Sequence, residues 1–92
     1  MSLNEMINHP NATIVDVRTE MEFSGGNVAG SINIPLHEVP DRVQDFKGMK
    51  KPLVLCCESG NRSGQATMFL KQNGIDEVFN GGGWAYVQIH KM

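Results

Sequence analysis

The sequence predicts an α/β fold in which a mainly parallel sheet is flanked by helices. Strand and helix signals alternate along the whole chain, as they do in layered α/β folds. Residues 13–17 are mostly apolar rather than alternating, which is typical of a strand covered on both faces. The 92 residues are 40% hydrophobic and 20% charged, so we expect one modest core in one domain.

The first elements are a short helix and a buried strand. Ser2 is followed three residues later by Glu5, and this pair fits a capping box. The sequence therefore predicts a helix over residues 3–8, which stops before Pro10. Residues 13–17 contain several β-branched side chains and have the length of a strand.

A turn, a strand and a helix are expected next. Thr19 can cap a helical turn, and the glycine pair at 25–26 ends it. Residues 31–35 indicate a brief strand that a proline closes. Residues 36–46 place apolar side chains at helical spacing, so they predict a short helix interrupted or started at Pro40.

The second half begins with the apolar strand 53–56 and a helix over residues 63–73, for which Ser63 is the expected N-cap. The remaining expected elements are a strand at 75–79, a turn at the glycines 81–83 and a helix at 84–91.

Composition excludes several classes of function. The formal charge of -2 offers no basic surface for nucleic acid or an anionic membrane. No apolar run approaches the roughly 18 residues of a spanning helix, and residues 1–9 lack the features of an export signal, so we expect a soluble, cytoplasmic chain. The three histidines, His9, His37 and His90, are scattered without ligand spacing, so no metal site is expected.

The two cysteines, Cys56 and Cys57, are adjacent, so they cannot form a disulfide of ordinary geometry. Side chains alternate along a strand, so one thiol should enter the core and the other should face the following loop. In that loop Gly60 permits a tight turn and Arg62 adds a positive charge. Loop N–H groups and the start of the next helix would favour a thiolate, which makes Cys57 a candidate nucleophile.

The number of residues between Cys57 and Arg62 distinguishes phosphoryl chemistry from sulfur transfer. In cysteine phosphatases five residues lie between nucleophile and arginine, and the loop wraps a tetrahedral oxyanion. Only four lie between them here, so the smaller loop favours a single sulfur over a phosphoryl group. Phosphatase and arsenate reductase chemistry are the disfavoured alternatives.

Three ordered blocks resemble the rhodanese sulfurtransferases in their single-domain form. One is the loop Cys57-Glu58-Ser59-Gly60-Asn61-Arg62-Ser63. An earlier block, residues 16–18, 22–23 and 26–35, is similar to the amino-terminal signature of the family, and Gly82-Gly83-Trp84 resembles its carboxy-terminal glycine pair and aromatic residue.

The resemblance implies one rhodanese domain over residues 1–92, with a three-layer fold and a sheet of about five strands. Cys57 would accept a sulfane sulfur from thiosulfate, polysulfide or a persulfide and pass it to cyanide or a thiol. The substrate-binding residues would be Glu58, Ser59, Gly60, Asn61, Arg62 and Ser63. No metal or organic cofactor is implied, and the expected partners are small sulfur anions or thiols, with the protein a monomer or weak dimer.

Glu58 departs from what a thiosulfate site needs, because a carboxylate beside the thiol raises its pKa and repels a dianion. We therefore expect thiosulfate to be a mediocre donor. A sulfur relay component or a regulatory binding module of the same fold remains the alternative. Arg18 is interpreted as a structural ion-pair partner of Asp16 and Glu22, and Trp84 as an anchor of the last helix.

Overall fold

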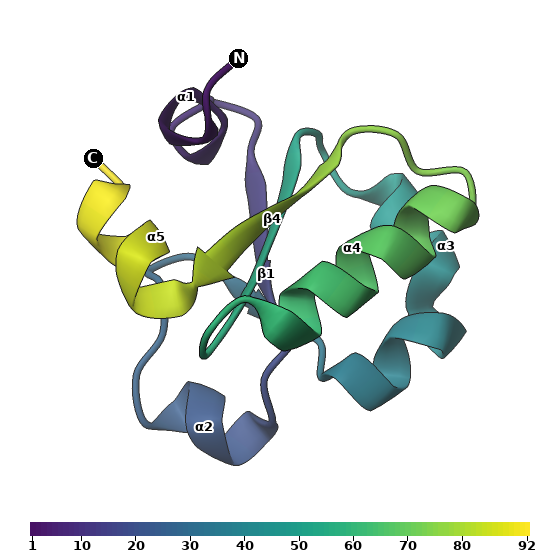
Figure 1. Ribbon diagram of the computed structural model, residues 1–92, viewed down its shortest axis with the longest axis horizontal. Coiled ribbons are helices and arrows are strands. Elements are labelled where there is room, and N and C mark those ends of the chain that lie inside the picture. Colours follow the sequence, from purple (N-terminus) through teal and green to yellow (C-terminus); the bar gives the residue numbers. More distant parts are fainter.

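The computed structural model describes residues 1–92, and a four-stranded parallel sheet forms its centre (Figure 1). The strand order is β2-β1-β3-β4, and every neighbouring pair is parallel. The strands are β1 (Thr13–Asp16), β2 (Ile32–Asn33), β3 (Leu53–Cys57) and β4 (Val78–Gly83). The α/β class is confirmed, whereas the implied strand count of about five is wrong, because the chain pairs only four strands.

Helices connect successive strands and also lie at both ends of the chain. They are α1 (Leu3–Ile7), α2 (Glu20–Ser24), the 3-10 segment η1 (Leu36–Arg42), α3 (Val43–Gly48), α4 (Asn61–Gln72) and α5 (Trp84–His90). Capping boxes start two of them: Ser2 with Glu5 opens α1, as expected, and Thr19 with Glu22 opens α2.

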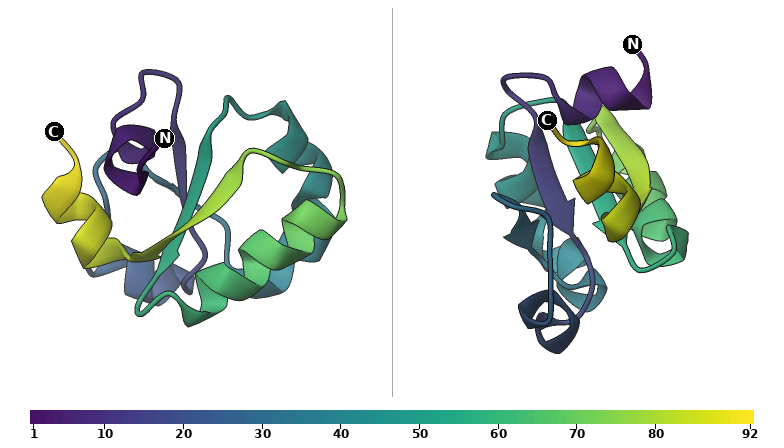
Figure 2. Two further views of the ribbon diagram at one scale, coloured as in Figure 1. Left: turned by 45° about the horizontal axis from the view of Figure 1, so that its top comes forward. Right: turned by 90° about the vertical axis from the view of Figure 1, so that its left-hand side faces the viewer.

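The helices cover both faces of the sheet, as Figure 2 shows. On one face η1, α3 and α4 bury a cluster that includes Val39, Phe46 and Leu70 against β1 and β3. On the other face α1 and α5 bury Ile7 and Val87 against the same two strands. Because β1 and β3 are apolar on both sides, they occupy the centre of the sheet.

The glycines at 81–83 continue β4 rather than form the expected turn. A bulge between Leu55 and Cys56 leaves Gly81 without a partner on β3, so Leu55 pairs with Asn80 and Cys56 pairs with Gly82. A Cβ on Gly81 would lie 2.7 Å from Val54 Cγ1. The missing side chains therefore let β4 lie close against β3, which a sequence reading of glycine as a turn signal overlooks.

Two of the expected helices also differ from those in the structure. The helix expected at 36–46 is split into η1 and α3, with Pro40 inside η1, because proline has no N–H for an α-helical bond. The helix after the cysteine loop begins at Asn61 rather than at residue 63.

No helix of the structure is long and apolar enough to cross a membrane.

Candidate active site

Cys57 is the last residue of β3, and its sulfur receives hydrogen bonds from the loop that follows. The Gly60 N–H lies 3.0 Å from Sγ, and the Ser63 N–H lies 3.4 Å from it. The Ser63 hydroxyl oxygen lies 3.3 Å from the same sulfur. The convergence of N–H groups expected from the sequence is therefore present, although Cys57 itself is only 1% exposed.

These donors change the acidity of the thiol. Burial raises the pKa of Cys57, but the hydrogen bonds from Ser63 and from the Ser59 and Gly60 N–H groups outweigh burial, so its pKa lies below the ordinary value for cysteine. A lowered pKa enlarges the thiolate fraction at neutral pH, and the thiolate is the nucleophile. From the sequence we expected the Glu58 carboxylate to raise this pKa. The net shift is downward, because the loop donors lower the pKa.

Gly60 makes the loop geometry possible. Its φ of +96° lies in the left-handed region, which glycine adopts without a Cβ penalty. Gly60 is also the N-cap of α4, so the expectation that Ser63 caps the helix is wrong. Ser63 instead lies in the first turn, fully buried, and directs its hydroxyl and its free N–H toward Cys57.

Cys56 lies on the opposite side of the sheet from Cys57. Cys56 packs with Ile14 and Val54 under α1 and α5, whereas Cys57 belongs to the cluster under α4. Burial, with a smaller contribution from nearby Asp16, raises the pKa of Cys56 to about 12. Cys56 is therefore a neutral core thiol, in line with the alternation expected along a strand.

Arg62 makes no hydrogen bond to the sulfur and forms an ion pair with Glu22 of α2. Its Nη1 and Nη2 atoms lie 2.7 and 3.0 Å from the two carboxylate oxygens of Glu22. The hydrogen bond to Arg62, with further hydrogen bonds to Thr19, holds the pKa of Glu22 at about 2. The sequence did not identify this pair, because the two residues are 40 positions apart.

Arg18 is buried and joins several segments below the site. Its guanidinium binds both oxygens of Asp16, donates to the Gly26 carbonyl at 2.7 Å, and lies 4.8 Å from the centre of the Trp84 ring. The structural role with Asp16 is confirmed, but Glu22 meets Arg18 only through its backbone carbonyl. Trp84 packs against the core cluster that α1 and α5 cover, which is consistent with an anchor for α5.

Glu58 extends from the loop toward solvent. Its side chain is 64% exposed, and one carboxylate oxygen lies 3.8 Å from Arg18 Nη1. Ser59 and Asn61 are exposed as well, and Asn61 begins α4. The loop therefore presents N–H groups inward and these polar side chains outward.

Asn80 is a member of the site that the sequence reading missed. Its Oδ1 accepts the Ser63 hydroxyl at 2.7 Å, and its Nδ2 donates to the Gly60 carbonyl at 3.0 Å. The available signal was its place directly after the strand expected at 75–79, because the carboxyl ends of neighbouring parallel strands meet at one edge of the sheet.

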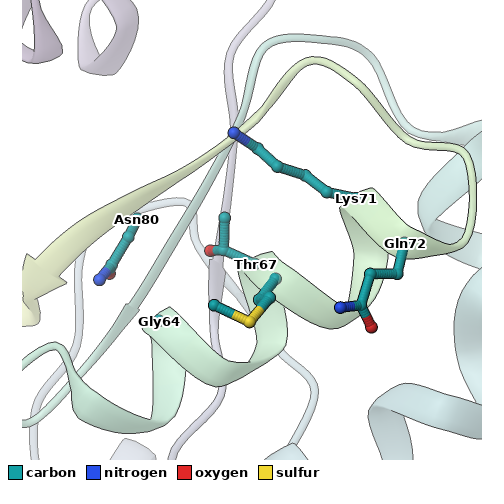
Figure 3. A pocket seen from close by; sticks show the side chains of 6 residues that line it. Gly64, Thr67, Lys71, Gln72 and Asn80 are labelled. Atoms are coloured by element: carbon teal, nitrogen blue, oxygen red, sulfur yellow. The ribbon is translucent and has the colours of Figure 1, made fainter.

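The largest cavity, of about 500 Å³, lies along α4 beside the loop and is not lined by Cys57. Figure 3 shows Asn80 and Gly64 at one end of this cavity and Lys71 and Gln72 at the other. Asn80 lines this cavity and also donates to the Gly60 carbonyl of the cysteine loop, so the loop and the cavity are neighbours.

A family model described as Rhodanese-like domain matches residues 2–89. The chain belongs to the rhodanese-like domain family. This rhodanese-like chain is 35% identical over 79 residues to the thiosulfate sulfurtransferase PspE of Escherichia coli, covering 85% of this chain and 76% of that protein. It is 39% identical over 69 residues to the uncharacterized protein YqhL of Bacillus subtilis. That match covers 75% of this chain but 54% of YqhL, so the chain spans about half the length of that relative.

A solved structure confirms the rhodanese-like fold. A rhodanese with anions from E. coli superposes with a TM-score of 0.74 at 33% identity, covering 82% of this chain and 89% of that one. The resemblance to the family inferred from the three sequence blocks is therefore confirmed.

Proposed function

We propose that this chain is a sulfurtransferase that carries a sulfane sulfur on Cys57 as a persulfide. The observation that supports it most directly is the convergence of the Gly60 N–H, the Ser63 N–H and the Ser63 hydroxyl on Sγ. These donors favour the attacking thiolate. Membership of the rhodanese-like family, whose members include PspE, supports the same chemistry.

The proposed reaction has two transfers. The Cys57 thiolate attacks the outer sulfur of thiosulfate, a new S–S bond forms, and sulfite leaves with the electron pair of the broken S–S bond. Cyanide or an acceptor thiolate then attacks the terminal sulfur of the persulfide, and the Cys57 thiolate is regenerated. The products are thiocyanate or an acceptor persulfide, and neither step requires a metal or an organic cofactor.

The loop from Glu58 to Ser63 holds the terminal sulfur in this proposal. Its N–H groups act on the negative persulfide much as an oxyanion hole acts on developing charge. Arg62 contributes by anchoring the loop, because its guanidinium is occupied by Glu22. The partners are small sulfur anions and thiols of the cytoplasm.

The donor is the part of the proposal on which Glu58 bears. An exposed carboxylate next to the cysteine disfavours a dianionic donor such as thiosulfate. A polysulfide, or a persulfide on another protein, is the preferred donor. This feature supports a second candidate function, in which the chain is a sulfur relay component or a regulatory binding module without efficient thiosulfate turnover.

Intact-mass measurement after incubation with thiosulfate or polysulfide tests the proposal. We expect a gain of one sulfur atom that cyanide or dithiothreitol removes. Cys57→Ala should abolish the gain, whereas the matched variant Cys56→Ala should retain it. A gain that persists in Cys57→Ala would overturn the assignment. Loading by polysulfide but not by thiosulfate would favour the relay, and no loading by either would favour the binding module.

A further inference from the structure

The Ser63 hydroxyl has one hydrogen and two acceptors within reach. Its oxygen lies 2.7 Å from Asn80 Oδ1 and 3.3 Å from Cys57 Sγ. A serine hydroxyl donates only one hydrogen bond at a time, although the hydrogen turns freely about the C–O bond. The two acceptors therefore compete for the same hydrogen.

Two further contacts fix the amide of Asn80 in the orientation that creates this competition. Nδ2 donates to the Gly60 carbonyl at 3.0 Å, and the Gly82 N–H donates to Oδ1 at 3.0 Å. Gly82 has a φ of +84°, in the left-handed region that glycine adopts readily. Turning the amide over would break both contacts, so Oδ1 is the atom that faces Ser63.

We propose, on the basis of the sulfur-transfer function proposed above, that Asn80 is a positioning residue that holds the Ser63 hydrogen while Cys57 is a neutral thiol and releases it to Sγ when the sulfur is charged. The contact of the Ser63 hydroxyl with Asn80 Oδ1 is shorter than its contact with Sγ. The amide oxygen is also a stronger acceptor than a neutral sulfur. A thiolate reverses this preference, because hydrogen bonds to charged groups are stronger than neutral ones.

The Ser63 hydrogen would turn toward Sγ before Cys57 takes up sulfur and turn back to Asn80 afterwards. When the thiol loses its proton to solvent, the hydroxyl of Ser63 turns toward Sγ. When Cys57 takes up sulfur, the negative charge moves to the terminal sulfur and the hydroxyl returns to Asn80. No covalent bond of Ser63 or Asn80 changes, so the pair acts only through the hydrogen bond to Sγ.

The ionisable groups around the sulfur come from four helices and strands and from the loop, but none of them hydrogen-bonds to the Ser63 hydroxyl or to Asn80. They are Asp16 and Arg18 at the end of β1, Glu22 of α2 with Arg62 of α4, Cys56 of β3 and Glu58 of the loop. Their charges act on Cys57 whether or not the hydroxyl is present. A comparison of proteins with and without that hydroxyl therefore isolates the competition.

The experiment measures the rate of Cys57 alkylation by iodoacetamide against pH in the Cys56→Ala background. Ser63→Ala is introduced into proteins that carry Asn80, Asn80→Ala or Asn80→Asp. On the acidic limb of the profile, we expect loss of the hydroxyl to slow alkylation by roughly threefold beside Asn80 and by roughly tenfold beside Asn80→Ala. Beside Asn80→Asp, which holds the hydrogen more firmly, the loss should have almost no effect.

Asn61→Asp is the matched control, because it adds the same charge to the loop without contacting Ser63. Ser63→Ala should slow alkylation equally with and without it. Equal slowing beside Asn80, Asn80→Ala and Asn80→Asp would overturn the proposal. Thermal melts establish that each variant folds, and if one Asn80 variant does not, the other still gives a prediction of opposite direction. Alkylation needs no sulfur donor, so this result is independent of whether the protein gains sulfur in the mass test.

Discussion

The guanidinium of Arg62 and the carboxylate of Glu22 form a two-pronged ion pair that ties the start of α4 to α2, with N–O distances of 2.7 and 3.0 Å. The two helices follow β1 and β3, so the pair belongs to the carboxyl edge of the sheet, where α2 and the start of α4 lie (Figure 1). The pair fixes the direction of Arg62, so the positive charge of this side chain is already partnered before any substrate arrives.

Glu22→Gln should lower stability at neutral pH and have no effect at strong acid. The pKa of Glu22 is lowered to about 2 from its ordinary 4.5. The ion pair therefore stabilises the fold fully at pH values above 4.5, and this stabilisation is lost as the pH falls toward about 2. Glutamine can keep the capping box with Thr19. The melting temperatures of the two proteins should therefore converge between about pH 5 and pH 2. A difference that does not change with pH would contradict this.

Glu58→Gln should raise kcat/KM for thiosulfate by roughly two- to threefold at low salt, because it removes a carboxylate that repels the dianion. The gain should shrink in high salt, where exposed charges are screened. Thiocyanate formation measures it. Glu77→Gln is the control, since Glu77 lies before β4, at the end of the sheet opposite the loop, and should give no gain. No gain from Glu58→Gln would sink the idea that this residue selects against thiosulfate.

Gly81→Ala should destabilise the protein by about 1–3 kcal/mol, because an added methyl group overpacks the contact between β4 and its neighbours. The new Cβ would lie 2.7 Å from Val54 Cγ1 and 3.1 Å from Val87 Cγ2. Gly48→Ala is the matched control, since no atom lies within 4 Å of a Cβ there. Urea denaturation should show Gly48→Ala to be neutral or slightly stabilising; equal losses for both variants would contradict the packing argument.

Arg18→Met should destabilise the protein by about 3–5 kcal/mol, because it leaves the carboxylate of Asp16 buried without its cation. Adding Asp16→Asn removes the charge and keeps an acceptor for the Arg18 backbone N–H, a bond of 2.9 Å. The double variant should therefore be more stable than Arg18→Met alone in urea denaturation. A double variant that is less stable than the single one would show that the charge is not what matters.

Local patterns predicted much of the fold. A capping box at Ser2 and a cap at Thr19 marked helix starts, and apolar runs marked β1 and β3. The glycines at 81–83 misled because glycine also permits close strand packing, which depends on a partner such as Val54 that is distant in sequence. The fifth strand implied by the resemblance is absent from the sheet.

The site divides in the same way. Cys57, Gly60 and Ser63 lie within the short segment 57–63, so their spacing alone predicted that they meet. Asn80 and Glu22 enter from other elements, and their contacts depend on the register of β4 and the position of α2. No pattern in the sequence specifies those two quantities, because both are set by packing across the sheet.

The placement of Cys56 and Cys57 on opposite faces of β3 has a consequence for any sulfur that the protein takes up. The backbone of β3 separates the sulfur carried by Cys57 from the Cys56 thiol. The Cys56 thiol is too weak an acid to form an attacking thiolate. The bound sulfur therefore has no acceptor thiol within the protein. How long it stays on Cys57 is set by acceptor molecules that reach the loop from solution.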